Sequence, residues 1–247
     1  MYASPTMFSC RYPIFRSATL ASAAVLALEG CTPGMSAAVD SVRQAVGSGS
    51  AVETSKLDPN FAYLRVTRGK HVGLLWRGNV ERSPGGPVEV YYSSTGEVVR
   101  LRDGRLMGAL GLVTEWRYVA DPAPGWADMV KSREPAAFVR TRDVMPGYRS
   151  GVRDELVLRR ITPPERTGLR DVDPGSLSWF EESVRDAGGR SRIPGVASDT
   201  LPPARYALDL AGEQPIVVYS EQCLALDLCF TWQRWPAAIQ RGATSAR

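Results

Sequence analysis

The sequence contains little of the material from which most catalytic sites are built. Its 247 residues include a single histidine, His71, and no Gly-x-Ser-x-Gly, phosphate-loop or His-Glu-x-x-His motif. Alternation in the segment 70–76 places His71 on the face opposite Val72 and Leu74, where a polar surface histidine is the ordinary interpretation. We therefore expect a protein that is not an enzyme and that has no catalytic residue and no cofactor.

Two further absences limit the classes of partner. After residue 30 no apolar run approaches the roughly 18 residues of a membrane-spanning helix, so we expect any membrane attachment to have another source. The formal net charge is only +4, and the basic residues are scattered among carboxylates rather than gathered in blocks. A strand-binding groove would interleave basic and aromatic residues, so we expect no nucleic-acid partner.

Two pairs of carboxylates are the remaining catalytic candidates in the sequence. Asp171 and Asp173 lie in Asp-Val-Asp-Pro-Gly, which lacks the further oxygen ligands of a calcium loop and indicates an ordinary turn. Glu181 and Glu182 are adjacent, and on a helix they would point in different directions and need not form an acid–base pair. Carboxylates brought together from distant segments stay open as an alternative.

The N-terminal segment resembles the export signal of a lipoprotein. Arg11 and Arg16 supply a basic region, and residues 17–28 form a run of 12 small or apolar residues, too short to span a bilayer. The tetrapeptide Leu-Glu-Gly-Cys that ends at Cys31 resembles the bacterial lipobox, with glutamate where a small residue is usual. We expect residues 1–30 to be a signal peptide and Cys31 to carry lipid. The alternatives are an ordinary signal cleaved nearby or an uncleaved anchor.

This leader predicts where the protein is held. Thr32 stands in place of the aspartate that often retains lipoproteins in the inner membrane, so we expect a lipid anchor in the outer membrane, facing the periplasm. Removing residues 1–30 takes away two arginines and one glutamate, which leaves 217 residues with a net charge of +3. That length suits one main domain.

The remaining cysteines predict a disulfide. Cys10 leaves with the leader and Cys31 takes the lipid, which leaves Cys223 and Cys229 in an oxidising compartment. Their spacing lacks companion ligands for zinc, so we expect no metal site. On one straight strand they would lie about 20 Å apart, so a bridge requires a turn at 225–227. Two buried free thiols are the alternative.

The chain divides into a tether and a domain. Residues 31–56 are typical of a tether, with a short helix over 35–46 and a Gly-Ser run. Residues 57–247 are predicted to form a single, mostly β domain, because short β-branched and aromatic runs alternate with turn residues. The predicted strands are 61–66, 70–76, 88–94, 97–102, 105–115, 155–161, 205–210, 215–221 and 228–234.

Alternation predicts a hairpin over 88–102. Its register pairs Tyr92 with Val99, sets Glu89 against Arg102 on the other face, and leaves the four-residue loop 94–97.

The next turn has a stronger signal. Asp103-Gly104 predicts a tight turn that brings Leu106 opposite Leu101 on one buried face, which extends the hairpin to a three-stranded meander.

The middle of the chain gives a weaker pattern. Residues 121–200 are rich in proline, glycine and charge, which predicts long loops with helical turns near 126–133 and 177–186. The six tryptophans could stack on sugar rings, but large aromatics more often fill a core or its rim. They are Trp76, Trp116, Trp126, Trp179, Trp232 and Trp235.

Four segments together resemble the YjbF/GfcB-type lipoproteins of capsule and exopolysaccharide operons. They are LDPNFA (57–62), LRDGRLMGALGL (101–112), IVVYSEQ (216–222) and FTWQRWP (230–236). The resemblance covers 57–236 without the central third, and Arg-Trp-Pro replaces the family's more usual Lys-Pro. It implies a mostly antiparallel sheet curled towards a barrel, an anchor in the outer membrane and a role in polysaccharide secretion or assembly. It supplies no catalytic residues.

The sequence therefore favours a non-enzymatic accessory of polysaccharide export, held in the outer membrane by its N-terminal lipid. The expected partners are the membrane, polysaccharide and other proteins of the export machinery. Two alternatives stay open: a lipid-anchored enzyme that modifies polysaccharide, such as a hydrolase, and a purely structural envelope protein. A wide acidic cleft with two facing carboxylates would favour the enzyme, and a closed barrel with only a rim of aromatics would favour the accessory.

Overall fold

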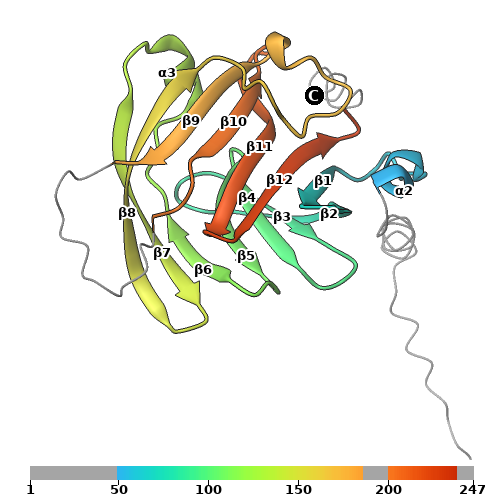
Figure 1. Cartoon of the computed structure of the whole chain (residues 1–247), viewed down its shortest axis with the longest axis horizontal. Coiled ribbons are helices and arrows are strands. Elements are labelled where there is room, and N and C mark those ends of the chain that lie inside the picture. Colours follow the sequence, from blue (N-terminus) through green and yellow to red (C-terminus); the bar gives the residue numbers. More distant parts are fainter. Residues whose placement is uncertain (1–48, 186–199, 238–247) are drawn as a thin grey trace, which may run out of the picture. The chain divides into compact units, whose positions relative to one another are not determined.

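The structure is a computed structural model that describes residues 49–185 and 200–237. Within these ranges twelve strands form a closed antiparallel barrel (Figure 1). This confirms the predicted mainly β fold and the barrel that the family resemblance implies. The strands are β1 (Tyr63–Arg68), β2 (His71–Glu81), β3 (Val88–Tyr92), β4 (Val98–Arg102), β5 (Arg105–Leu110), β6 (Glu115–Ala120), β7 (Ala136–Met145), β8 (Arg149–Ile161), β9 (Ser178–Val184), β10 (Ala204–Asp209), β11 (Ile216–Ala225) and β12 (Leu228–Trp235).

Short helices lie beside the strands. The helix α2 (Gly49–Thr54) places Val52 in an apolar cluster with Leu74 of β2 and Trp235 of β12. The helix α3 (Trp126–Lys131) lies between β6 and β7, where a helical turn is predicted from the sequence. A 3₁₀ turn, η1 (Pro174–Ser176), lies between β8 and β9. The helix predicted over 35–46 lies outside the described residues.

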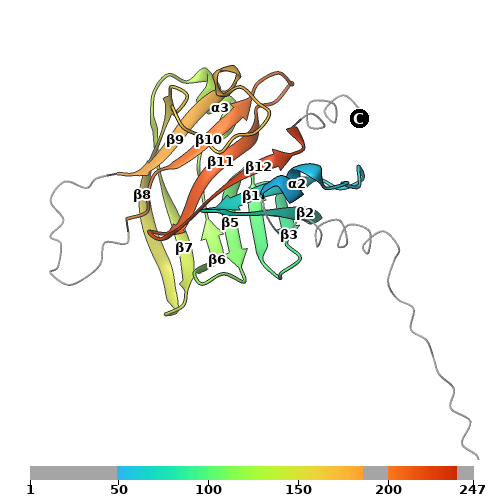
Figure 2. The same cartoon turned by 45° about the vertical axis from the view of Figure 1, so that its right-hand side comes forward.

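The strand order gives the barrel two different ends. Each strand pairs with its successor, and β1 closes the ring with β12. The tight turns β1–β2, β3–β4, β5–β6, β7–β8 and β11–β12 therefore lie at one end, which we call the hairpin end. At the other end, the entry end, the chain enters β1, and the longer connections with α3 and η1 lie there (Figure 2).

The meander around the Asp103-Gly104 turn is confirmed. Leu101 of β4 pairs directly with Leu106 of β5, and their exposed fractions are 0% and 2%. Asp103 and Gly104 have φ of +50° and +78°, as a two-residue turn of this kind needs.

The predicted register of the preceding hairpin is wrong by one residue. Tyr92 pairs with Val98 rather than Val99, and Glu89 lies opposite Leu101 rather than Arg102. The reason is the loop, which is three residues long instead of four: the Ser93 N–H donates to the Glu97 carbonyl at 2.9 Å, while the Ser93 Oγ accepts from the Glu97 N–H at 2.9 Å. The last residue of this loop, Gly96, has φ of +102°.

The prediction of long loops over 121–200 is also wrong in large part. The strands β7 and β8 form a long ladder that runs from the pair Ala136 and Leu158 to the pair Val144 and Arg149, although both strands carry many charged residues. The predicted helix over 177–186 is a strand, β9, whose Phe180 pairs with Tyr206 inside the barrel. The strand β6 is likewise absent from the sequence-based prediction.

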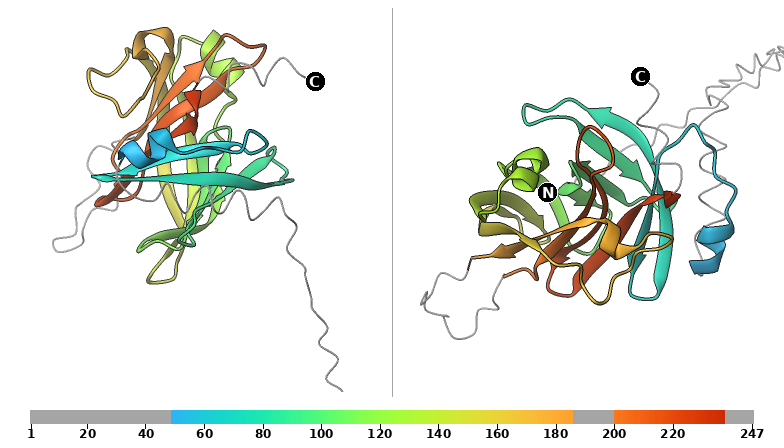
Figure 3. Two further views of the ribbon diagram at one scale, coloured as in Figure 1. Left: turned by 90° about the vertical axis from the view of Figure 1, so that its right-hand side faces the viewer. Right: turned by 90° about the horizontal axis from the view of Figure 1, so that it is seen from above.

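Figure 3 shows the ring of strands from two further directions. Opposite walls of this barrel touch directly, so that side chains fill its lumen. Gln222 of β11 accepts from the Leu106 N–H at 3.1 Å and donates to the Gly104 carbonyl at 3.0 Å. The Trp116 Nε1–H of β6 donates to the Leu224 carbonyl of β11 at 3.1 Å. These contacts join strands far apart in the ring and make the barrel a packed body rather than a channel.

Candidate functional site

One set of charged side chains lies inside the barrel. Arg140 of β7 donates to Asp154 of β8 at 3.0 and 3.1 Å and to Glu182 of β9 at 2.9 Å. Arg142 donates to Asp154 at 2.7 and 3.1 Å, and both guanidinium groups lie 4.9 Å from the centre of the Trp116 ring. Alternation along β7 puts both arginines on the inner face, and the carboxylates on β8 and β9 compensate their charge there.

The pKa values of the two carboxylates of this set are shifted in opposite directions. Burial alone would raise the pKa of Asp154, but hydrogen bonds from Arg142 and the charge of Arg140 hold that pKa below its usual range. Burial raises the pKa of Glu182, and the Arg140 charge only partly opposes this. The Glu182 Oε2 atom has no hydrogen-bond partner within the described residues.

A second set of charged side chains lies near the junction of β1 and β12, where Arg234 and Glu89 are largely buried and Arg77 is exposed. Arg234 of β12 donates to Glu89 of β3 at 2.8 Å and to the Val217 carbonyl at 3.0 Å. Arg77 of β2 donates to the same carboxylate at 2.7 Å. Glu89, predicted to face outward, therefore points into the barrel, and burial raises the pKa of the neighbouring Tyr91 to about 12.

The set around Arg140 is closed to a substrate of any size. The cavity beside Arg140, Glu182 and Gln222 has a volume of only ≈ 10 Å³, which is room for about one water molecule. Asp154 is 5% and Glu182 3% exposed. The charges of this set therefore hold neighbouring strands together and are shielded from solvent.

An open groove lies at the hairpin end, between the β1–β2 and β11–β12 turns. Its volume is ≈ 580 Å³, within the usual range of ligand sites. One wall carries Arg68, Lys70 and His71, and the other carries Leu226, Asp227 and Cys229. Because basic side chains outnumber the single carboxylate, this groove is the candidate binding site.

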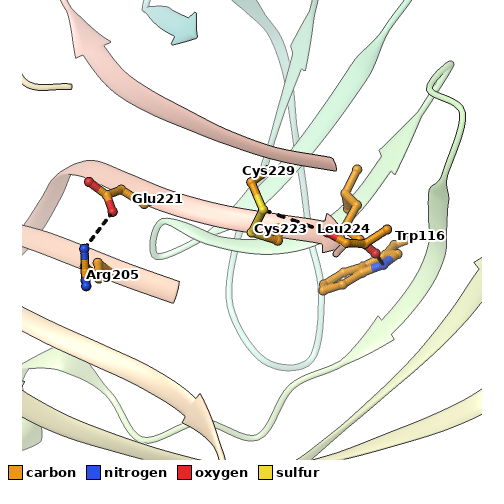
Figure 4. Close-up of a disulfide and its surroundings, with 7 residues drawn as sticks. Trp116, Arg205, Glu221, Cys223, Leu224 and Cys229 are labelled. Carbon is orange, nitrogen blue, oxygen red and sulfur yellow. Dashed lines mark hydrogen bonds and ion pairs between the residues drawn. A yellow bond between two sulfur atoms is a disulfide. The ribbon is translucent and has the colours of Figure 1, made fainter. Parts of the chain in front are cut away.

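Cys223 and Cys229 form a disulfide that supports one wall of the groove (Figure 4). They pair directly across the β11–β12 hairpin, and the chain turns at Leu226 and Asp227, within the segment where a bridge requires a turn. Cys223 is buried, whereas Cys229 is exposed and lines the groove. The bridge therefore fixes this hairpin beside the basic wall.

The other residues singled out in the sequence have structural positions. Asp173 accepts from the Gly175 N–H at 3.1 Å and starts η1, as an ordinary turn residue does. Glu181 and Glu182 lie on a strand and face opposite sides of the barrel wall, so they form no acid–base pair. Cys31 lies outside the described residues.

The tryptophans form parts of the core and its rim. Trp76 is partly buried against Tyr92, and the other five are 5% exposed or less: Trp116, Trp126, Trp179, Trp232 and Trp235. Within the described residues the exposed large aromatics are Tyr118 and Tyr148 instead.

The described residues contain neither a metal-binding group of side chains nor a membrane-spanning helix. Between 49 and 185 and between 200 and 237, no group of three or more histidine, cysteine or acidic side chains could hold a metal ion. In the same ranges, no helix has the length and apolar character needed to cross a membrane.

Sequence reasoning did not find the basic groove, and it did not find the interior ion pairs. The groove depends on two turns that are 155 residues or more apart in the chain, and only the closure of β1 on β12 brings them together. The alternation of Arg140 and Arg142 with Val139 and Thr141 was the available signal for the interior cluster.

No protein-family model matches this sequence, and no curated protein matches it. Among solved structures, the chain is similar to the hypothetical lipoprotein YmcC from Escherichia coli K12, with a TM-score of 0.44 and 15% sequence identity. The likeness covers 71% of this chain and 83% of that chain. A likeness of this size does not bear on function, which is inferred below from the sequence and geometry of this chain.

Proposed function

We propose that this protein is a periplasm-facing lipoprotein of the outer membrane that acts as a non-enzymatic accessory in capsule or exopolysaccharide secretion or assembly. Three features support this: the leader that ends at Cys31, the four segments that resemble YjbF/GfcB-type lipoproteins, and a barrel packed with side chains.

The packed barrel is the observation that carries the choice of an accessory over an enzyme. A glycoside hydrolase places two carboxyl groups about 5–10 Å apart on either side of a bound sugar. Here Asp154 and Glu182 are sealed inside the barrel and paired with Arg140. On the outer surface Arg205 pairs with Glu181 and with Glu221, each at 3.4 Å, so these two carboxylates are engaged with a cation (Figure 4 shows the Glu221 pair).

A combined assay separates the three candidate functions. Purified protein is incubated with the polysaccharide of its own host, and reducing ends are counted; in parallel, surface polysaccharide and detergent sensitivity are measured in a deletion strain. We expect no new reducing ends and less surface polysaccharide. New reducing ends would favour the enzyme. Unchanged polysaccharide with a detergent-sensitive envelope would favour the structural protein.

A further inference from the structure

We propose that the groove between the β1–β2 and β11–β12 turns binds the carboxylate groups of an acidic, uronate-bearing polysaccharide. This inference rests on the proposed function and adds to it a substrate class and a place of contact. Three observations carry it: the way in which the groove arises, the state of its basic side chains and the rigidity of its second wall.

The groove arises because two neighbouring hairpins separate at their tips. The ladder between β1 and β12 ends at the pair Thr67–Thr231, whereas β12 begins three residues earlier, at Leu228. The edge of β12 that faces β1 therefore has no ladder partner over 228–230. Backbone N–H and C=O groups on such an edge are available to other hydrogen-bonding groups, including the hydroxyl groups of a sugar.

The basic side chains on the first wall, Arg68 and Lys70, are exposed and have no ion-pair partner among the described residues. Arg68 and Lys70 flank Gly69 at the β1–β2 turn, and neither side chain forms an ion pair or hydrogen bond with another residue of the part that the structure describes. The buried arginines, such as Arg140 and Arg234, are by contrast fully engaged with carboxylates. An arginine and a lysine that face an open groove can form charge-assisted hydrogen bonds with the carboxylates of a ligand that enters from solution.

The second wall suits the remainder of a sugar polymer. Leu226 is 58% exposed beside the Cys223–Cys229 bridge, and together they give an apolar surface next to the polar strand edge. Since the bridge holds this hairpin in one shape, little ordering is needed when a ligand binds. The groove is open to solvent, so a long chain can pass through it without threading an end.

Binding to soluble probes tests this assignment. The full-length lipidated protein, in detergent, is titrated with polygalacturonate and with dextran as the neutral polymer. We expect binding to polygalacturonate that weakens with salt, and no binding to dextran. The double variant Arg68→Ser/Lys70→Ser should weaken binding by about five- to tenfold, as the loss of two exposed ion pairs allows.

Two further variants make the test specific to the groove. Lys131→Ser/Arg133→Ser removes the same charge from exposed positions at the entry end and should leave the affinity unchanged. Asp227→Asn removes the carboxylate from the groove and should tighten binding, because a like charge no longer repels the ligand. Asparagine keeps the turn preference of aspartate, so the hairpin should be preserved.

The outcomes distinguish the groove assignment from the proposed function. Equal losses in the two double variants, or no binding to polygalacturonate, would overturn the groove assignment. Binding to vesicles that contain lipopolysaccharide, without binding to polygalacturonate, would assign the groove to lipid phosphates and also overturn it. If binding fails while the deletion strain still loses surface polysaccharide, the proposed function survives. If binding succeeds in a strain with normal polysaccharide, the groove survives and the proposed export role fails.

Discussion

The substitution Gly104→Ala adds one methyl group at a contact between opposite walls of the barrel, and its effect on stability tests that contact. Gly104 lies in the β4–β5 turn with φ of +78°, and a Cβ atom there would lie 2.6 Å from the Cβ of Val217 on β11. Gly69 is a matched control, because it has φ of +56° and no atom within 4 Å of its Cβ position. Alanine at Gly69 therefore adds backbone strain without adding a contact.

The magnitudes follow from these two effects. An alanine in the left-handed region costs about 1–2 kcal/mol. Overpacking a filled interior adds about 1–3 kcal/mol, since the added methyl group would overlap the buried Val217 side chain. We expect Gly69→Ala to lower the free energy of unfolding by about 1–2 kcal/mol and Gly104→Ala by about 2–5 kcal/mol. Because a domain is stabilised by only about 5–15 kcal/mol, the second loss is large.

Urea unfolding of both variants, followed by tryptophan fluorescence with the disulfide kept oxidised, measures the difference. An unchanged dependence of stability on urea concentration would show that both folded and unfolded states are comparable between variants. Equal losses for Gly104→Ala and Gly69→Ala would refute the reasoning, because the turn would then not touch β11 and the barrel would not be packed across its lumen.

Three other predictions concern the fold, the bridge and the anchor. Leu101→Ala should lower the free energy of unfolding by about 2–5 kcal/mol, and Arg100→Ala, on the other face, by less than about 1 kcal/mol; the opposite order would contradict the register. Mass spectrometry of the alkylated, unreduced protein should find no free thiol at Cys223 or Cys229, and two labelled thiols would disprove the bridge. Cys31→Ser should release the protein or leave it unprocessed, whereas unchanged detergent partitioning and mature mass would argue against lipidation.

Local pattern was a reliable guide where a turn and the apolar alternation agreed. At Asp103-Gly104 the turn residues and the alternation of Leu101 and Leu106 require the same pairing, and the structure has it. At Ser93–Glu97 the alternation favoured one register, but the Ser93 Oγ accepts hydrogen bonds from the Thr95 and Glu97 N–H groups and closes a shorter loop. The one-residue change in loop length then reversed β3 relative to β4, so that Tyr91 and Glu89 share a face with Val99 and Leu101.

Charged strands were missed because their partners are distant in sequence. Arg140 and Arg142 are typical of solvated segments when they are considered alone, and Asp154 follows them only after a turn. They can be buried because Asp154 of β8 and Glu182 of β9 pair with them and compensate their charge. The same holds for Glu89, whose partner Arg234 lies 145 residues away.

The segment 177–186 shows a different reason for error. Leu177, Phe180 and Val184 lie at helical spacing, and this spacing outweighed the short alternation in the prediction. The segment is nevertheless a strand, because Ser178–Val184 pairs with β8 on one side and with β10 on the other. Tertiary pairing overrides such a weak local preference.

The proposed role in polysaccharide export is tested most directly by the distribution of the polymer in the cell. Surface and intracellular polysaccharide are measured separately in a deletion strain, and again after complementation with the wild-type gene or with Cys31→Ser. We expect the deletion to reduce the surface fraction, the wild type to restore it, and Cys31→Ser to fail although the protein is made. A deletion strain with the normal amount and length of polymer at its surface would contradict the role.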